Sequence, residues 1–341
     1  MSGAPELEYR RQVLDMMRGY RQAHVLISCA ELGVFAALHA GPAPANALAE
    51  QLGVEPAALP RLLNAAVALG LLELRGAHYA NSPLADACLA AEGPYHLGHL
   101  VRREGAFYRR WSNLTEAVRT GRRPEENRRD EGQRDWVRDF ELALYDAART
   151  AAPAVAEALG AALPADGRPL RAIDIGGGHG AYSIALARRY PRLTAEGFEL
   201  PPVVPGARRI VAAAGASERV TVREGDFKAD ALGQGYDLAL LFGVLVSETP
   251  DAAVALLRKV RAALRPGGAV VIRGFYLDDR RTGPADAVLA DLHMLLSTDA
   301  GGAHSLADVY GWLHDAGFGP PETLSLPPPE RSSLILARRP S

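Results

Sequence analysis

The chain has 341 residues, 48% of them hydrophobic, and its 38 Lys and Arg against 40 Asp and Glu give a formal net charge of −2 at pH 7. This length favours more than one domain, and the near-neutral charge gives no electrostatic reason to expect nucleic acid or an anionic membrane as a partner. No apolar run approaches the roughly 20 residues that span a bilayer, and the N-terminus lacks an apolar targeting core. The two cysteines, Cys29 and Cys88, have no metal-ligand neighbour at short spacing, so we expect a reduced, cytoplasmic protein without a metal site.

Residues 1–100 predict a helical domain with the outline of a winged helix. Helices are expected at Tyr20–Leu38, Ala45–Leu52 and Pro56–Gly70, followed by a glycine-turned hairpin at Leu72–Asn81. This outline often binds DNA, which requires clustered Lys and Arg to neutralise phosphates. The charged residues between positions 45 and 74 are three glutamates and one arginine. The segment is net acidic, and DNA binding is therefore disfavoured.

Residues 101–160 predict a charged helical connector. Helices are expected from Arg109 to Arg119 and from near Asp135 to Leu159, with a polar loop at Gly121–Gly132 between them. The run Arg122–Glu131 mixes both charge signs and indicates a solvated loop without a function of its own. We expect the connector to lie over the mouth of a pocket in the domain that follows.

Residues 161–341 predict an α/β domain, because apolar strand patterns alternate with helical patterns. Strands are expected at Leu170–Ile173, Thr194–Leu200, Val220–Gly225, Tyr236–Leu245 and Ala269–Gly274. The fourth strand is apolar on both faces, as a central parallel strand would be. The alternation predicts a doubly wound parallel sheet that binds its ligand at the carboxyl ends of the strands.

The segment Asp174–Gly180, with the sequence DIGGGHG, lies where the first of these strands turns into a helix. Its glycines allow positive φ and a close approach of the backbone to a ligand, and the helix that follows presents free N–H groups. The spacing departs from the dinucleotide fingerprint, because Ala181 stands three residues after Gly178. The segment predicts a binding loop for a nucleotide-like cofactor.

Acidic and aromatic residues follow the next two strands. Glu199 ends the second strand, where a carboxylate can accept both hydroxyls of a ribose. Asp226 and Phe227 follow the third strand and offer an acceptor for an adenine amine and a face for its ring.

Four motifs together resemble the class I S-adenosylmethionine (SAM) dependent methyltransferases. They are Ile173–Gly180, Phe198–Val204, Gly225–Phe227 and Leu264–Gly268. More narrowly, the chain resembles along nearly its whole length the two-domain small-molecule O-methyltransferases. That family includes plant caffeate and acetylserotonin enzymes and bacterial tailoring enzymes of antibiotic and pigment pathways.

The resemblance implies a cofactor, an assembly and a set of site residues. The cofactor is SAM, and the N-terminal domain makes a homodimer by burying the apolar faces of the helices at Tyr20–Leu38 and Pro56–Leu72. The helix after the polar loop contributes to the acceptor wall through some of its aromatic and apolar side chains. The implied cofactor residues are Asp174, Gly176 and Gly178 at the methionine end, Glu199 at the ribose, Asp226 and Phe227 at the adenine, and Phe242.

The chain departs from the family at the expected general base. Most of these enzymes carry a His-Asp-Trp tripeptide past the fourth strand, where this chain has Val246-Ser247-Glu248, and the carboxylate that orients the histidine falls on Gly274. We therefore expect a site that does not use this base. Replacement candidates are His293, His304 and Glu248, although a lone histidine on a helix is more often structural. Arg273, near the end of the fifth strand, either binds an acidic acceptor or forms a structural ion pair.

The predicted function is SAM-dependent methyl transfer to a small-molecule acceptor of secondary or pigment metabolism, with the acceptor atom left open among oxygen, carbon and nitrogen. General base catalysis contributes roughly 10²–10⁴-fold, whereas positioning the reactants contributes about 7–11 kcal/mol. Positioning is the larger effect, so transfer does not require the missing histidine. The alternative is an enzyme of this fold that binds SAM but catalyses a hydroxylation, a decarboxylation or a pericyclic step.

Overall fold

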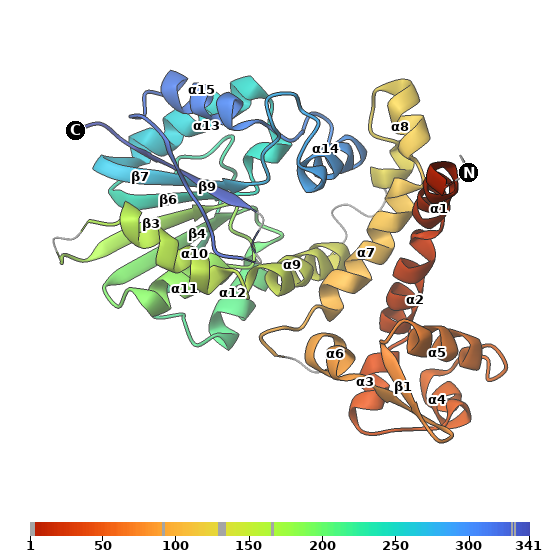
Figure 1. Ribbon diagram of the computed structural model, residues 1–341. Coiled ribbons are helices and arrows are strands. Elements are labelled where there is room, and N and C mark those ends of the chain that lie inside the picture. Colours follow the sequence, from red (N-terminus) through yellow and green to blue (C-terminus); the bar gives the residue numbers. More distant parts are fainter. Residues whose placement is uncertain (1–3, 91–92, 129–133, 165–166, 329, 331) are drawn as a thin grey trace. The chain divides into compact units, whose positions relative to one another are not determined.

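The structure is a computed structural model that describes residues 4–90, 93–128, 134–164, 167–328, 330 and 332–341 (Figure 1). The chain divides into two compact units, one ending at Tyr108 and the other beginning at Arg109. Along the parts of the chain that are described, no helix combines the length and the apolar character needed to cross a membrane.

The N-terminal unit is a helical domain with one small antiparallel hairpin, as the sequence predicts. Its elements are α1 (Ala4–Arg18), α2 (Tyr20–Glu31), α3 (Val34–His39), α4 (Ala45–Leu52), α5 (Leu59–Ala68), β1 (Leu72–Arg75), β2 (His78–Asn81), α6 (Pro83–Ala85), a π-helical turn (Asp86–Ala90) and most of α7 (Gly98–Trp111). The expected single helix at Tyr20–Leu38 is wrong in one respect. Gly33, with φ +79°, takes a left-handed conformation and separates α2 from α3.

The apolar faces of α2 and α5 pack inside their own domain. Ile27 and Cys29 of α2 and Leu59 and Leu63 of α5 belong to one buried cluster. This corrects the expectation that these faces are reserved for a second subunit. The exposed apolar face is on α1, which exposes Leu7, Val13, Met16 and Met17 by 68%, 60%, 76% and 58%.

The second unit is built on a seven-stranded sheet with the order β5-β4-β3-β6-β7-β9-β8. The strands are β3 (Leu170–Ile175), β4 (Leu193–Glu199), β5 (Val220–Glu224), β6 (Tyr236–Phe242), β7 (Leu264–Gly274), β8 (Glu322–Leu324) and β9 (Ser333–Arg338). The five predicted strands run parallel, and β9 pairs antiparallel with both β7 and β8. The doubly wound α/β fold is confirmed, with two short strands added at one edge.

Helices cover both faces of this sheet (Figure 1). The helices and turns of this unit are α8 (Leu114–Thr120), a 3₁₀ turn (Glu125–Arg128), α9 (Arg134–Ala148), α10 (Ala152–Ala158), a 3₁₀ turn (Leu159–Ala162), α11 (Ala181–Arg189), α12 (Val204–Ala213), a 3₁₀ turn (Leu245–Ser247), α13 (Pro250–Ala263), α14 (Ala285–Ser297) and α15 (Leu306–Asp315). The sheet lies between α10, α11 and α12 on one side and α13 and α15 on the other. The central strand β6 is buried from Tyr236 to Leu241. Its alternate side chains enter two different cores: Leu238 and Leu240 pack toward α10, α11 and α12, while Ala239 and Leu241 pack toward α13 and α15.

Candidate active site

The loop between β3 and α11 has the backbone that its glycines predict. Gly176, Gly178 and Gly180 have φ values of +66°, +49° and +67°, a region that side chains with a Cβ rarely adopt. Gly177 lies so close to Asp174 that an added Cβ would overlap its carboxyl group. Glycine at these positions therefore allows this backbone conformation and leaves the backbone exposed at the carboxyl end of a central strand.

Asp174 is a buried carboxyl group with one oxygen left unsatisfied. It is 1% exposed, and its Oδ2 accepts a hydrogen bond of 2.8 Å from Ser183 Oγ. Its Oδ1 has no hydrogen-bond partner among the residues described. Burial raises the pKa of Asp174 to about 7, and the charge of Glu199 adds to the shift. A buried acceptor without a donor costs free energy, so this atom indicates a ligand that donates to it.

Glu199 ties the tip of β4 to the glycine loop. Its Oε1 accepts from the backbone N–H of Gly178 at 2.6 Å, and its Oε2 accepts from the N–H of Leu200 at 3.1 Å. The side chain is 8% exposed, and burial raises its pKa despite both hydrogen bonds. Each carboxylate oxygen keeps a further lone pair. Two adjacent hydroxyls, as on a ribose, fit this arrangement.

Asp226 and Phe227 lie at the end of β5, beside the tip of β4. The Asp226 carboxylate accepts from the backbone N–H of Lys228 at 2.8 Å, and its own backbone N–H donates to Asp230 at 2.8 Å. Phe227 is half-buried and packs against the core beneath α13. This turn is fixed by its own hydrogen bonds and holds both side chains at the ligand edge of the sheet.

Two aromatic residues that the sequence reasoning did not assign to the site, His179 and Tyr182, form a cluster with the predicted Phe242. His179 Nδ1 accepts from the N–H of Ala181 at 3.1 Å, so the imidazole itself caps α11. Burial, and then the charge of Arg273, lower the pKa of His179 to about 4. Tyr182 stacks edge-on against Phe242 with ring centroids 4.8 Å apart. Phe242 thus lies beside the glycine loop, although only the fold brings it to Tyr182.

Arg273 forms an ion pair. Its guanidinium lies 3.0 Å from Glu330, with the two side chains 19% and 20% exposed, and it also covers the ring of Tyr182 at 5.3 Å. Of the two expectations for this residue, the structure shows the structural ion pair.

Val246 and Gly274, which stand where the resemblance implies a histidine and its orienting carboxylate, lie together at one small cavity. Val246 is in the 3₁₀ turn after β6, and Gly274 ends β7; both line this cavity with Arg273 and His304. The ring of Tyr276 lies 3.3 Å from where a Cβ on Gly274 would be. A side chain at position 274 would therefore crowd the Tyr276 ring.

His304 presents one free ring nitrogen near this cavity. Its Nε2 lies 3.1 Å from the carbonyl oxygen of Leu245. Because a carbonyl only accepts, Nε2 carries the hydrogen, and in the neutral ring Nδ1 carries the lone pair. The half-buried ring packs edge-on against Trp312 at 4.6 Å, and burial lowers its pKa. Burial thus favours the neutral ring, in which Nδ1 is the nitrogen that can accept a proton.

His293 has both ring nitrogens engaged. Trp111 Nε1 donates to its Nδ1 at 3.2 Å, and because an indole N–H only donates, Nδ1 must be the acceptor. Its Nε2 lies 3.2 Å from Ser297 Oγ. Taking up a proton at Nδ1 would break the hydrogen bond from Trp111. The arrangement favours a structural role over that of a base.

Glu248 belongs to a different cavity. It is 5% exposed, and its Oε1 lies 2.8 Å from Lys228 Nζ. Together with Phe227 and Lys259, these two residues line a cavity of about 390 Å³ that does not include Val246 or His304. The three predicted base candidates therefore do not converge on one point.

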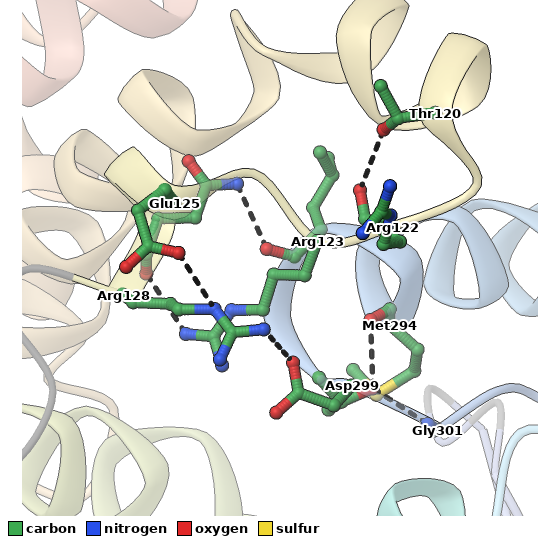
Figure 2. Close-up of polar contacts among 11 residues, drawn as sticks. Thr120, Arg122, Arg123, Glu125, Arg128, Met294, Asp299 and Gly301 are labelled. Atoms are coloured by element: carbon green, nitrogen blue, oxygen red, sulfur yellow. Dashed lines mark hydrogen bonds and ion pairs between the residues drawn. The ribbon is translucent and has the colours of Figure 1, made fainter.

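The connector is fastened to the C-terminal end of α14, as Figure 2 shows for the contacts of Arg128. Asn127 is 3% exposed and donates to the carbonyl of Leu296 at 2.9 Å, and Arg128 forms an ion pair with Asp299. The expectation of a solvated loop at Arg122–Glu131 is therefore wrong for the buried Asn127, whereas Arg128 is exposed as expected. Residues 129–131 of that run lie outside the described residues.

The second helix of the connector reaches the glycine loop. Tyr145 of α9 has its ring centroid 6.1 Å from that of His179. Trp136, Phe140 and Leu144, which the family resemblance would also place at the acceptor wall, lie on the same half-buried helix. The helix α9 of the connector thus contacts the glycine loop through Tyr145.

A glycine loop, an acid at the tip of the next strand and a parallel α/β sheet define a class I methyltransferase. Residues 166–319 match the O-methyltransferase domain, and residues 14–91 match the O-methyltransferase dimerisation domain.

Relatives match along almost the whole chain. The 3-hydroxy-5-methyl-1-naphthoate 3-O-methyltransferase of Streptomyces sahachiroi is 32% identical over 98% of this chain and 97% of its own length. The tetracenomycin polyketide synthesis 8-O-methyl transferase of Streptomyces glaucescens is 32% identical over 96% of each chain. The crystal structure of human N-acetylserotonin methyltransferase in complex with SAM is similar, with a TM-score of 0.87 and 28% identity over 98% of each chain. The chain belongs to the O-methyltransferase family and is a SAM-dependent methyltransferase.

Proposed function

We propose that this enzyme methylates a hydroxyl group of a small secondary metabolite. The observation that carries methyl transfer from SAM is the buried pair Asp174 and Glu199, whose remaining acceptor positions fit the donors of that cofactor. The two streptomycete relatives are named for O-methylation of a hydroxynaphthoate and of a polyketide, which supports a hydroxylated acceptor of that kind.

The residues of the glycine loop and the strand tips hold the cofactor in this proposal. Asp174 accepts from the ammonium of the methionine end, Glu199 accepts from the ribose hydroxyls, and the turn at Asp226 and Phe227 receives the adenine. Phe242 and the glycine backbone shape the space between them. Bound here, SAM supplies a methyl group on a sulfonium sulfur, an activated electrophile that needs only an aligned nucleophile.

His304 is the residue best placed to assist the acceptor. Its Nδ1 would accept the proton that the acceptor hydroxyl releases. Its Nε2–H continues to donate to the Leu245 carbonyl, so the imidazolium stays oriented. The backbone carbonyl thereby takes the orienting part that a carboxylate plays in related enzymes.

The test is to incubate the enzyme with methyl-labelled SAM and a panel of hydroxylated naphthoates, and to measure S-adenosylhomocysteine (SAH) and labelled product together. We expect stoichiometric amounts of both. An acceptor that is converted while no SAH appears would overturn methyl transfer and favour the non-methylating alternative.

We also propose a homodimer that uses the N-terminal unit. The match of residues 14–91 to a dimerisation domain supports it, as does the apolar stripe of Val13, Met16 and Met17 on α1. Sedimentation of the full chain should show a dimer. Replacing Val13 and Met16 with lysine should shift it toward monomer, and an unchanged dimer would remove α1 from the interface.

A further inference from the structure

Glu141 is a buried residue of α9 that is not among the cofactor residues proposed above. It faces Gly206 of α12 so closely that an added Cβ there would overlap its carboxylate. The two helices enclose a cavity of about 470 Å³ that Glu141, Gly206 and Arg209 help to line. Since α12 begins just after Glu199, this cavity adjoins the tip of β4.

The Glu141 carboxylate is not satisfied by the protein. The residue is 5% exposed, and its Oε1 has no hydrogen-bond partner within the described ranges. The charged groups that face it are the exposed Arg209 of α12 and Glu199 of β4, while Arg138 of its own helix also lines the cavity. Burial raises the pKa of Glu141 to about 7; the charge of Arg209 opposes this shift, and that of Glu199 adds to it.

Asp174, Glu199 and Glu141 thus form one group of buried acids. Asp174 and Glu141 each keep an unpartnered oxygen, and Glu199 interacts electrostatically with both. Like charges in a poorly solvated site repel, so the group is stabilised when a cation enters it. SAM carries a sulfonium charge that its product SAH has lost, so the two ligands differ in the charge that these acids sense.

We propose that Glu141 is a third carboxylate of the cofactor site, a positioning residue whose negative charge favours SAM over SAH. The inference rests on the proposed cofactor site at Asp174 and Glu199. An ionised Glu141 attracts the sulfonium ligand, and the attraction disappears once the methyl group has left. The product is then held less tightly than the reactant, which favours turnover.

The pH dependence follows from the same charge. Below pH 7 Glu141 is mostly protonated and cannot discriminate between the ligands, while above pH 7 it is ionised and favours SAM. The preference for SAM over SAH therefore rises with pH. Binding of SAM near neutral pH releases protons, because the cation stabilises the ionised acids.

The experiment is calorimetric titration of SAM and SAH into the full-length enzyme at pH 6 and pH 8. Variants are Glu141→Gln and, as a matched control, Glu157→Gln, an exposed carboxylate that pairs with Arg189. We expect Glu141→Gln to reduce the SAM-to-SAH preference at pH 8 by up to about tenfold and to weaken its pH dependence, with Glu157→Gln unchanged. An unaltered preference, or equal loss of both ligands, would overturn the proposal.

A second variant tests the same proposal in case Glu141→Gln does not fold. Arg209→Gln retains Glu141 but removes the nearby cation that lowers its pKa. We expect the rise in SAM preference to move to higher pH in this variant, and an unmoved profile would count against Glu141. If the unaltered enzyme binds neither ligand, the cofactor site itself is wrong, and that result is distinct from a failure of Glu141 alone.

Discussion

The cofactor region and the acceptor region of this enzyme treat their polar groups in opposite ways. In the cofactor region, Asp174 and Glu141 are buried with an unpartnered oxygen each. In the proposed acceptor region, His293 is hydrogen-bonded at both ring nitrogens and the charge of Arg273 is paired with Glu330, although Arg273 Nε has no partner among the described residues. The first region therefore favours a cationic ligand, whereas the charge of Arg273 in the second is already paired. The comparison indicates that cofactor binding depends on electrostatics, whereas binding of the acceptor depends mainly on its fit.

The largest expected effect separates His304 from His293. We expect His304→Gln to lower kcat by about 10²–10⁴-fold, since it removes the proton acceptor Nδ1. His293→Gln should cost less than about tenfold, because that ring has no free nitrogen for the acceptor. Initial rates of SAH formation across pH 5.5–8.5 measure both, and the low-pH limb should be lost in the His304 variant alone. Equal effects of the two variants would contradict the assignment of different roles to His304 and His293.

An effect of similar size, on cofactor binding rather than on kcat, is expected for Glu199→Ala. Loss of two hydrogen bonds to a charged group, at about 1.5–3 kcal/mol each, should weaken SAM binding by two orders of magnitude or more. Glu224→Ala, at the exposed end of β5, is the control. Calorimetry should show a loss in the first variant and wild-type affinity in the second. Unchanged binding in a folded Glu199 variant would refute the ribose assignment.

We expect Asp174→Asn to raise the stability of the ligand-free protein while it weakens the binding of SAM. The folded-state pKa of Asp174 is about 7 and its ordinary value 3.8, so the folded state binds more protons between these values. Below pH 3.8 the ionisation of Asp174 does not lower the free energy of unfolding. Between pH 3.8 and pH 7 the destabilisation by this carboxyl group grows with pH. We therefore expect Asp174→Asn to stabilise the ligand-free protein at pH 8 by a few kcal/mol at most, and less at pH 5.

Thermal melts of the ligand-free Asp174→Asn variant at the two pH values test this. SAM should no longer raise its melting temperature, although it does so for the unaltered enzyme. A variant that is less stable at pH 8 would show that the ionised carboxylate is satisfied by the protein.

The sequence predicted best what lies close together along the chain. The glycine loop and the acid at Glu199 each sit at the end of an apolar strand, and consecutive parallel strands bring their carboxyl ends to one edge. The buried strand β6 followed from its apolar run. Local pattern was sufficient for these features, because the fold adds only the parallel arrangement of neighbouring strands.

The acceptor region was less predictable, because its contacts join distant segments. The hydrogen bond of Trp111 to His293 and that of His304 to Leu245 connect residues far apart in the chain. Which nitrogen of each imidazole carries the hydrogen follows from these partners, and no local pattern encodes it. The short strands β8 and β9 were missed as well, since β8 has three residues and both depend on pairing with an existing edge.

The contact between Tyr276 and Gly274 limits how this active site can change. Installing a histidine at Val246 and a carboxylate at Gly274 would give the acid–base pair that the family resemblance implies, but a Cβ at position 274 would lie 3.3 Å from the Tyr276 ring, so that the ring would have to move aside slightly. The histidine alone would have no orienting carboxylate, and the carboxylate alone would only crowd the ring. Changes of acceptor that keep glycine at position 274 therefore meet fewer steric obstacles than construction of that pair.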